Sequence, residues 1–271
     1  MNERQRRLIA LTRLLTAHPR RVFTLSALAE RWGVAKSTLS EDMAAIKSVL
    51  AQEKVGEIVT QVGSSGGVRY LPALDKPAAY QSLQRWSRML AAPDRMTPEG
   101  FLYMTDLLFN PQWIEPMAHL LTVPFQMLSI DLVATVETKG IPLALACARQ
   151  LDVEMVLIRR DSRLSEGSAV SINYLSGSSR RIQSMSLARR TPVRDRSILF
   201  VDDFMKAGGT AHAAQDLLKE FNARVVGVGV LVSTVEPAHK LVESYYSCLQ
   251  WDDQKPLSVA PSDWALAACT D

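Results

Sequence analysis

The sequence has few cysteines and no long apolar run. Its three cysteines, Cys147, Cys248 and Cys269, are odd in number and show no C-x-x-C spacing, which argues against a disulfide framework or a zinc cluster. The longest apolar stretches, such as residues 141–148, are far shorter than the ~20 residues that a membrane-spanning helix needs. The arginine-rich start is not followed by an apolar signal segment. We therefore expect a cytoplasmic protein in a reducing compartment, with no membrane partner.

Two signatures of known site types are missing as well. The sequence contains no G-x-x-x-x-G-K-[ST] element, the loop by which many nucleoside triphosphatases hold phosphates. Its four histidines lie far apart, without the spacing of metal ligands: His18, His119, His212 and His239. We therefore expect neither a P-loop enzyme nor a metal site formed directly by the protein.

What the sequence does contain is enough apolar material for two folded domains. It has 271 residues, of which 47% are hydrophobic and 22% charged, the composition of a globular protein. Residues 1–74 carry 11 Lys and Arg against 6 Asp and Glu, a net charge of +5, whereas the remainder carries 20 against 22, a net charge of −2. A basic domain beside a mildly acidic one assigns binding of a phosphate backbone to the N-terminal part. A merely solvated arginine face would give the same count.

The N-terminal segment has the pattern of a winged helix. Leucines at helical spacing predict three helices, and alternating residues around a glycine-rich turn predict a hairpin. The predicted helices span 4–16, 25–32 and 35–50, and the predicted strands span 57–62 and 68–71 around a turn at 63–67. Pro72 and Pro77 bracket a short link, so we expect a winged-helix domain at 1–74 and a second domain at 75–271.

Within this segment, Ala29, Gly33 and Leu39 have the spacing of a helix-turn-helix. The second helix would present its first polar residues to a major groove, and the wing would reach phosphate or a minor groove. The DNA-binding residues predicted in this way are Lys36, Ser37, Thr38, Ser40 and Arg69. The alternative is a protein-binding winged helix in which Ser37 only caps the helix. The concentration of positive charge favours double-stranded DNA.

The C-terminal part alternates strands and helices. It begins with a set of short helices from Ala78 to about Leu121, interrupted at Pro93, Pro98 and Pro111. Strands are then predicted at 132–136, 153–158, 197–201 and 224–232, helices at 141–151 and 210–221, and an extra hairpin at 168–174 and 181–187. This alternation predicts an α/β domain with a doubly wound, mainly parallel sheet.

The run ILFVDDFMKAGGT at 198–210 is the most specific pattern in the sequence. In it, an apolar strand ends in Asp202 and Asp203 and passes through a glycine turn into a helix. Two carboxylates at a strand end can hold ribose hydroxyls, while glycine amides and Thr210 at a helix N-terminus can cradle a phosphate. An ordinary strand-to-helix turn is the alternative. The run closely resembles the phosphoribosyl pyrophosphate motif of type I phosphoribosyltransferases.

Two further elements follow the order that this resemblance implies. The run TVETKGIP at 135–142 lies where the family binds pyrophosphate; there backbone amides, Thr138 and Lys139 would suit an anion, and Gly140 allows close approach. The run RRDSR at 159–163, followed by 166–168, lies where the enzymes keep a basic flexible loop that closes over the diphosphate. These arginines are equally compatible with a solvated surface run.

Over nearly its whole length, the sequence resembles the purine operon repressor family of Gram-positive bacteria. The resemblance rests on the winged helix and on the segments SED at 40–42, GGV at 66–68, VSINY at 170–174 and VDDFMKAGGT at 201–210. It implies a homodimer that binds paired operator sites near purine genes and is released by phosphoribosyl pyrophosphate (PRPP) carrying Mg²⁺. The implied PRPP-binding residues are Thr138, Lys139, Gly140, Arg160, Asp202, Asp203, Phe204, Met205, Lys206, Ala207, Gly208, Gly209 and Thr210. Phe101 is a further candidate, for the pocket wall.

One departure from the enzymes bears on activity. Where they usually have small residues and a threonine before the two glycines, this chain has Phe204, Met205, Lys206 and Ala207. Phe204 and the Lys206 stem would crowd the sugar, which would spoil the geometry for attack by a base. We therefore expect a repressor with no transferase activity and no catalytic cofactor. The alternative is a phosphoribosyltransferase with a secondary DNA- or RNA-binding role, and guanosine tetraphosphate is a candidate competitor for the pocket.

Overall fold

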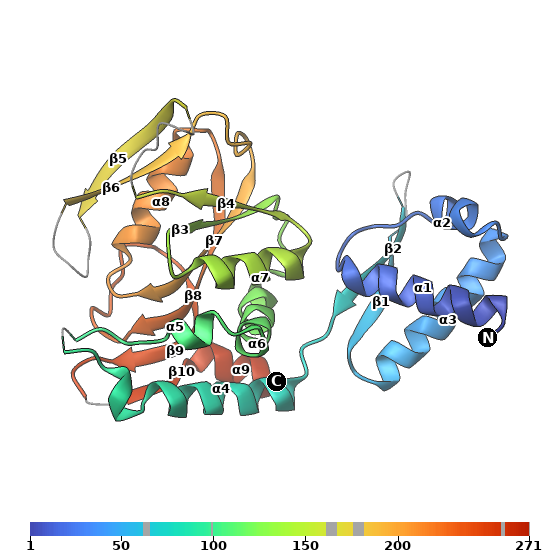
Figure 1. The fold of residues 1–271 in the computed structure, drawn as a ribbon, viewed down its shortest axis with the longest axis horizontal. Helices are drawn as coiled ribbons and strands as arrows, with labels where there is room; N and C mark the ends of the chain where they lie inside the picture. Colours follow the sequence, from blue (N-terminus) through green and yellow to red (C-terminus); the bar gives the residue numbers. More distant parts are fainter. Residues whose placement is uncertain (62–65, 99, 161–166, 176–181, 256–257, 271) are drawn as a thin grey trace. The chain divides into compact units, whose positions relative to one another are not determined.

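The computed structural model describes residues 1–61, 66–98, 100–160, 167–175, 182–255 and 258–270 (Figure 1). The chain divides into two compact units, Met1–Asp75 and Lys76–Asp271, whereas the sequence analysis places the boundary at residue 74. The two units are described separately. Parts of three predicted stretches lie outside the described residues: 62–65 of the wing, 161–163 and 166 of the basic loop, and 181 at the start of the second hairpin arm.

The N-terminal unit is a winged helix. Its elements are α1 (Glu3–Ala17), α2 (Leu25–Trp32), α3 (Lys36–Gln52), β1 (Gly56–Gln61) and β2 (Gly67–Pro72). The strands β1 and β2 are antiparallel, and Phe23 forms a bridge to Val68 that adds a short third edge to the sheet. Gly33 ends α2 with a φ of 61°, as expected of the turn glycine. Ala35 is the N-cap of α3, so the interpretation of Ser37 as a cap is wrong.

One apolar core joins the three helices to this sheet: Leu11, Leu15, Leu28, Leu39, Met43, Ile46, Leu50, Ile58, Val68 and Tyr70. A carboxylate on α3, that of Asp42, is also fully buried. It accepts hydrogen bonds from Arg4 Nε at 3.2 Å and from Arg7 Nε at 2.5 Å, both on α1. These charge-assisted bonds tie the first half of α1 to α3.

The C-terminal unit is an α/β domain, as the alternation predicts. It opens with α4 (Lys76–Leu90), η1 (Pro93–Arg95), α5 (Thr105–Leu108), α6 (Pro111–Thr122) and η2 (Val123–Phe125). Its central part consists of β3 (Leu132–Val136), α7 (Ile141–Leu151), β4 (Glu154–Ile158), β5 (Ala169–Leu175), β6 (Ile182–Ala188), β7 (Ser197–Met205), α8 (Gly209–Lys219) and β8 (Arg224–Thr234). It ends with β9 (Tyr246–Asp252), β10 (Ser258–Pro261) and α9 (Asp263–Thr270).

Six strands form the main sheet, in the order β10-β9-β8-β7-β3-β4. All neighbours in it are parallel except β10 and β9, which confirms the predicted doubly wound, mainly parallel sheet. The predicted hairpin β5–β6 forms a separate two-stranded sheet. The sequence pattern predicts none of β9, β10 and α9, because polar residues such as Gln250 interrupt the apolar run of β9.

The strand β7 is longer than predicted. The expectation that the strand ends before the acid pair is wrong, because β8 continues beside β7 and pairs with it as far as Met205. Asp202 and Asp203 therefore lie within the strand. Their backbone is held by the sheet and not by a loop.

The entry into this domain also differs from the expected set of short helices. The helix α4 has 15 residues, and Pro77 is its second residue. A missing N–H costs no hydrogen bond in the first turn of a helix, so this proline starts the helix instead of preventing it. Pro116 lies inside α6.

Helices cover both faces of the main sheet (Figure 1). The helix α7 packs against β3, β4 and β7, and α6 packs against β8 and β9, whereas α8 packs against β7, β8 and the β5–β6 hairpin. Ala134 of β3 and Phe200 of β7 share a buried cluster with Leu217 of α8. Because the faces are covered, the edge at the carboxyl ends of the parallel strands is where a ligand can bind.

Replacing Asp42 with Ala should destabilise the N-terminal unit by about 3 kcal/mol, because it leaves Arg7, whose side chain is 10% exposed, without its counter-charge. Urea unfolding followed by circular dichroism measures the change in free energy of unfolding. Glu41→Ala is the matched control, since Glu41 is the exposed neighbour, and it should change that free energy by less than about 0.5 kcal/mol. Equal effects of the two substitutions would contradict the role given to Asp42.

Candidate functional site

The motif at 198–210 forms the carboxyl end of β7 and the start of α8. Between the two elements, Gly208 is the N-cap of α8 with a φ of 81°, in the left-handed region that favours glycine. No side chain of the described residues caps this helix, so its first amide groups are available to an anion. The backbone N–H of Leu241 donates to Ala207 O at 2.9 Å and holds the turn from outside. The turn thus has the form of a phosphate cradle.

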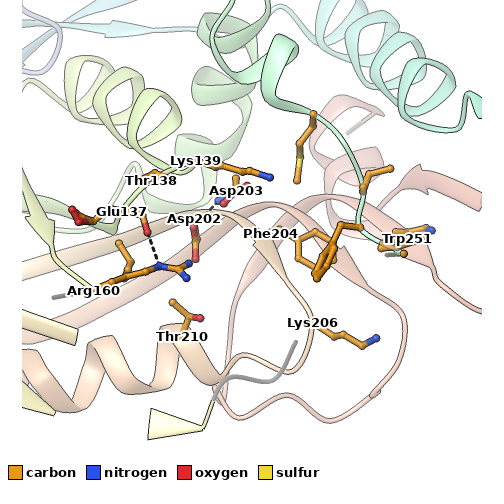
Figure 2. A pocket seen from close by; sticks show the side chains of 15 residues that line it. Glu137, Thr138, Lys139, Arg160, Asp202, Asp203, Phe204, Lys206, Thr210 and Trp251 are labelled. Atoms are coloured by element: carbon orange, nitrogen blue, oxygen red, sulfur yellow. Dashed lines mark hydrogen bonds between the residues drawn. The ribbon is translucent and has the colours of Figure 1, made fainter. Parts of the chain in front are cut away.

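A cavity of about 540 Å³ opens beside this turn (Figure 2). It brings together Phe101 and eight of the residues predicted to bind the effector: Thr138, Lys139, Arg160, Asp202, Asp203, Phe204, Lys206 and Thr210. A smaller cavity of about 50 Å³ shares part of this wall and adds the remaining motif residues, Met205, Ala207, Gly208 and Gly209. Met205 is 3% exposed and belongs to the core.

Asp202 and Asp203 form the acidic part of the larger cavity. The backbone N–H of Asp203 donates to Asp202 Oδ1 at 2.9 Å. Desolvation raises the pKa of Asp202 well above its ordinary value, and the charge of Asp203 adds to this effect. Desolvation also raises the pKa of Asp203. A carboxyl pair that can share a proton offers both donors and acceptors, which suits a ligand with neighbouring hydroxyls.

The segment between β3 and α7 lies against the acid pair. A Cβ atom at Gly140 would lie 2.8 Å from Asp202 Oδ1 and 2.7 Å from Thr135 Oγ1, too close for any side chain. Glycine therefore lets this loop approach the acids, and Thr138 and Lys139 just before it line the cavity. In Figure 2 the Lys139 ammonium group lies beside the acid pair.

Arg160 reaches the same cavity from the end of β4. Its Nε donates to Glu137 O at 3.0 Å, and Arg159 forms an ion pair with Glu137 Oε1 at 3.2 Å (Figure 2 shows the first of these). Glu137 itself lines the cavity. No sequence pattern assigns Glu137 to the site, yet this residue fixes both arginines at the polar end.

The other end of the cavity is apolar. Phe101, Leu102 and Met104 line it from the segment before α5, and Phe204 and Trp251 line it from β7 and β9. The rings of Phe204 and Trp251 have centroids 5.9 Å apart at an angle of 55°. No motif marks Trp251 in the sequence. Only the position of β9, two strands away from β7 in the sheet, brings it here.

Four of the predicted DNA-binding residues lie at the start of α3. Lys36, Ser37 and Ser40 are exposed, and Thr38 is half-buried. Ser40 Oγ donates to Lys36 O at 3.1 Å within the helix. Leu39, which lies among them, points into the core as expected. The start of α3 thus presents a short polar and basic face.

The fifth predicted residue, Arg69, lies on β2 opposite Val59. It is half-buried, and its Nε has no hydrogen-bond partner among the described residues. Desolvation and the charge of Arg69 lower the pKa of Arg20. Arg20, which the sequence analysis does not name, therefore lies close to Arg69. Two neighbouring guanidinium groups favour binding of an anion.

Other kinds of site find no support in the part of the chain that the structure describes. No group of three or more His, Cys, Asp or Glu side chains there could hold a metal ion. None of its helices is long and apolar enough to cross a membrane. All three cysteines are buried and form no disulfide.

Two family descriptions match the sequence, one in each unit. "Bacterial purine repressor, N-terminal" matches residues 3–72, and "Phosphoribosyl transferase domain" matches residues 116–263.

Similar solved structures include two adenine phosphoribosyltransferases. That of Thermoanaerobacter pseudethanolicus aligns with a TM-score of 0.54 at 18% identity, over 62% of this chain and 99% of its own. That of Rhodothermus marinus aligns with a TM-score of 0.53 at 22% identity, over 65% of this chain and 99% of its own. At these identities the similarity establishes the fold alone.

Similar sequences include complete regulators. The purine biosynthesis transcriptional repressor PurR of Bacillus subtilis is 44% identical over 246 residues, which are 91% of this chain and 86% of the relative. The purine biosynthesis transcriptional activator PurR of Lactococcus lactis subsp. lactis is 35% identical over 250 residues, 92% of each chain. With both family descriptions matched in the same order, this chain belongs to the PurR family of bacterial regulators of purine biosynthesis.

Proposed function

We propose that the protein is a transcriptional repressor of purine biosynthesis genes, which binds operator DNA as a homodimer and is released by PRPP carrying Mg²⁺. One observation carries the proposal: a basic winged helix shares a chain with a cavity in which an acid pair, a glycine cradle and a cationic loop converge. The first part suits a phosphate backbone, and the second suits a sugar that carries phosphates at two positions.

The cavity offers a partner for each group of PRPP. The carboxyl pair, Asp202 and Asp203, suits the two ribose hydroxyls, while Thr210 and the first amides of α8 suit the 5′-phosphate. Thr138, Lys139 and Arg160 suit the diphosphate. Three acids also line the cavity, Glu137 among them, so an effector that brings a divalent cation would meet less repulsion than a bare polyanion.

Whether the protein represses or activates transcription is inferred from the more similar of the two relatives described above. The B. subtilis protein, at 44% identity, is a repressor, whereas the L. lactis protein, at 35% identity, is an activator. We therefore propose repression, in which occupancy of the operator lowers transcription and the effector restores it.

Binding of the effector without catalysis is the second element of the proposal. Phe204 and Lys206 line the cavity, and the Phe204 ring is held against Trp251. Ala207 lines the cradle, where a hydroxyl would add a phosphate ligand. A base would have to reach the anomeric carbon past these side chains, and small displacements of that kind are costly to catalysis.

The apolar end suggests a competitor for the effector. Phe101, Phe204 and Trp251 offer ring faces beside the anion-binding part, so a nucleotide with several phosphates could place its base there. Guanosine tetraphosphate is the candidate that we propose, and it would favour the DNA-bound form by excluding PRPP.

Lys36→Ala should weaken binding to a duplex carrying a purine-gene promoter, and it should reduce the slope of log affinity against log salt by about one, because one phosphate contact is lost. Fluorescence anisotropy titrations at several salt concentrations measure both quantities. Lys47→Ala is the matched control, because Lys47 is an exposed lysine nearer the other end of α3. If Lys36→Ala keeps the slope of the parent, the assignment of the start of α3 is wrong.

The protein should form no nucleotide when it is incubated with PRPP, Mg²⁺ and each common purine or pyrimidine base. The physical reason is the crowding by Phe204 and Lys206. Chromatography of the reaction mixture tests this expectation, with an authentic phosphoribosyltransferase as the positive control. Turnover with any base would replace the proposal by that of a bifunctional enzyme and regulator.

Asp203→Ala should give a repressor that binds operator DNA like the parent but no longer leaves it when PRPP is added, because a partner of the ribose hydroxyls is lost. A ligand can weaken DNA binding only if it binds the DNA-free protein more tightly than the DNA-bound protein. DNA then weakens binding of the ligand by the same factor. Operator affinity, measured over a PRPP titration for both proteins, tests this. Equal loss of affinity in both would show that the acid pair is not the sensing site.

A further inference from the structure

An ion pair engages one of the lysines that line the effector cavity. Lys206, just before the cradle, places its Nζ 2.8 Å from Asp253 Oδ2 in the turn after β9. The Asp253 side chain is 12% exposed and that of Lys206 is 43% exposed. The hydrogen bond from Lys206 holds the pKa of Asp253 below its ordinary value, so the carboxylate is charged at neutral pH.

Among the described residues that line the two cavities, Lys206 is the one positively charged residue that lines both. It lines the larger cavity together with the acid pair and the smaller cavity together with Gly208 and Gly209. In Figure 2, however, its side chain extends away from Asp202 and Thr210. Its charge is thus directed to Asp253, although its backbone position suits a ligand phosphate in the cradle.

Of the groups around this ion pair, Asp253 is the main competitor of a ligand for the Lys206 ammonium group. Lys240, on the neighbouring segment, donates from Nζ to Thr234 O at 2.8 Å and to Thr234 Oγ1 at 3.2 Å. The charges acting on Lys240 are those of Glu236, Asp253 and Lys206. Lys240 is therefore engaged with β8, whereas the long and half-exposed Lys206 side chain has room to change partner.

We propose that Asp253 competes with the ligand's phosphate for the Lys206 ammonium group, and that this competition sets the effector concentration at which the cavity fills. The inference rests on the proposed function, because it concerns the same cavity and the same phosphorylated sugar. It adds Asp253, which no sequence motif marks, as a residue that determines affinity without belonging to the phosphate-binding turn.

The exchange is energetically feasible because the ion pair is weak. Water screens a partly exposed ion pair and leaves it little net stability, so a phosphate in the cradle can displace the carboxylate. Asp253 also repels any anion in the cavity. Both effects raise the dissociation constant of the parent, and both vanish when the carboxylate is replaced by an amide.

Asp253→Asn should therefore lower the dissociation constant of PRPP with Mg²⁺ by about threefold to tenfold. Isothermal titration calorimetry on the full chain measures it. Asp252→Asn is the matched control: Asp252 is the adjacent acid, but it pairs with Lys255 and not with Lys206, so its replacement should leave the constant unchanged. The affinity for ribose 5-phosphate, measured by competition with PRPP, should rise by the same factor. The affinity for inorganic pyrophosphate, which suits the Thr138–Gly140 loop, should rise less.

A double-mutant cycle separates competition from a structural effect. Lys206→Met should abolish most of the gain in PRPP affinity in the Asp253→Asn background, because the released ammonium is then missing. The single variant Asp253→Asn should also show a steeper salt dependence of binding than the parent, since its Lys206 contacts the phosphate without first breaking an ion pair.

Four results would decide against the inference. Equal or weaker PRPP binding by Asp253→Asn would overturn the competition, and so would the same gain in affinity with and without Lys206. In both cases, binding of PRPP by the parent would leave the proposed function standing. A gain confined to pyrophosphate would place Lys206 at the wrong end of the ligand and overturn it as well. Failure of the parent to bind PRPP at all would refute the proposed function itself and the inference with it.

Discussion

The geometry of the site depends on the position of β7 in the middle of the main sheet. Hydrogen bonds to β3 on one side and β8 on the other hold this strand, and β8 stays paired to its last residue. The chain then turns through Gly208 directly into α8. Because strand and helix are both rigid, the acid pair and the phosphate cradle have a fixed separation, and the remaining elements only add walls around them.

Two of the three cations that line the larger cavity already have a partner within the chain. Arg160 donates to Glu137 O, Arg159 pairs with the Glu137 carboxylate, and Lys206 pairs with Asp253. An incoming anion must therefore exchange these contacts instead of meeting free charges. Such an arrangement favours a ligand that offers several correctly placed phosphates over a single small anion, because each exchange is nearly neutral in energy.

Local sequence patterns predicted most of the fold, because those elements form from residues close together in the chain. The turn glycine Gly33, the inward-facing Leu39 and the two hairpins all depend on periodicity and turn chemistry. The same patterns failed where pairing with a distant strand decides the outcome. The strand β7 extends to Met205 because β8 lies beside it, and β9 forms at the far side of β8 without a continuous apolar run.

The sequence by itself also predicted which residues suit a phosphate, since the pattern of glycines, adjacent acids and the lysine after Thr138 depends only on neighbours along the chain. It could not determine the rest of the cavity wall. Trp251 and the segment around Phe101 come from places far from the motif in sequence, and so does Asp253, which pairs with the cavity residue Lys206. The order of strands in the sheet brings β9 near β7, and no local pattern encodes that order. Tertiary packing therefore decided which side chains restrict the cavity and which acid holds Lys206.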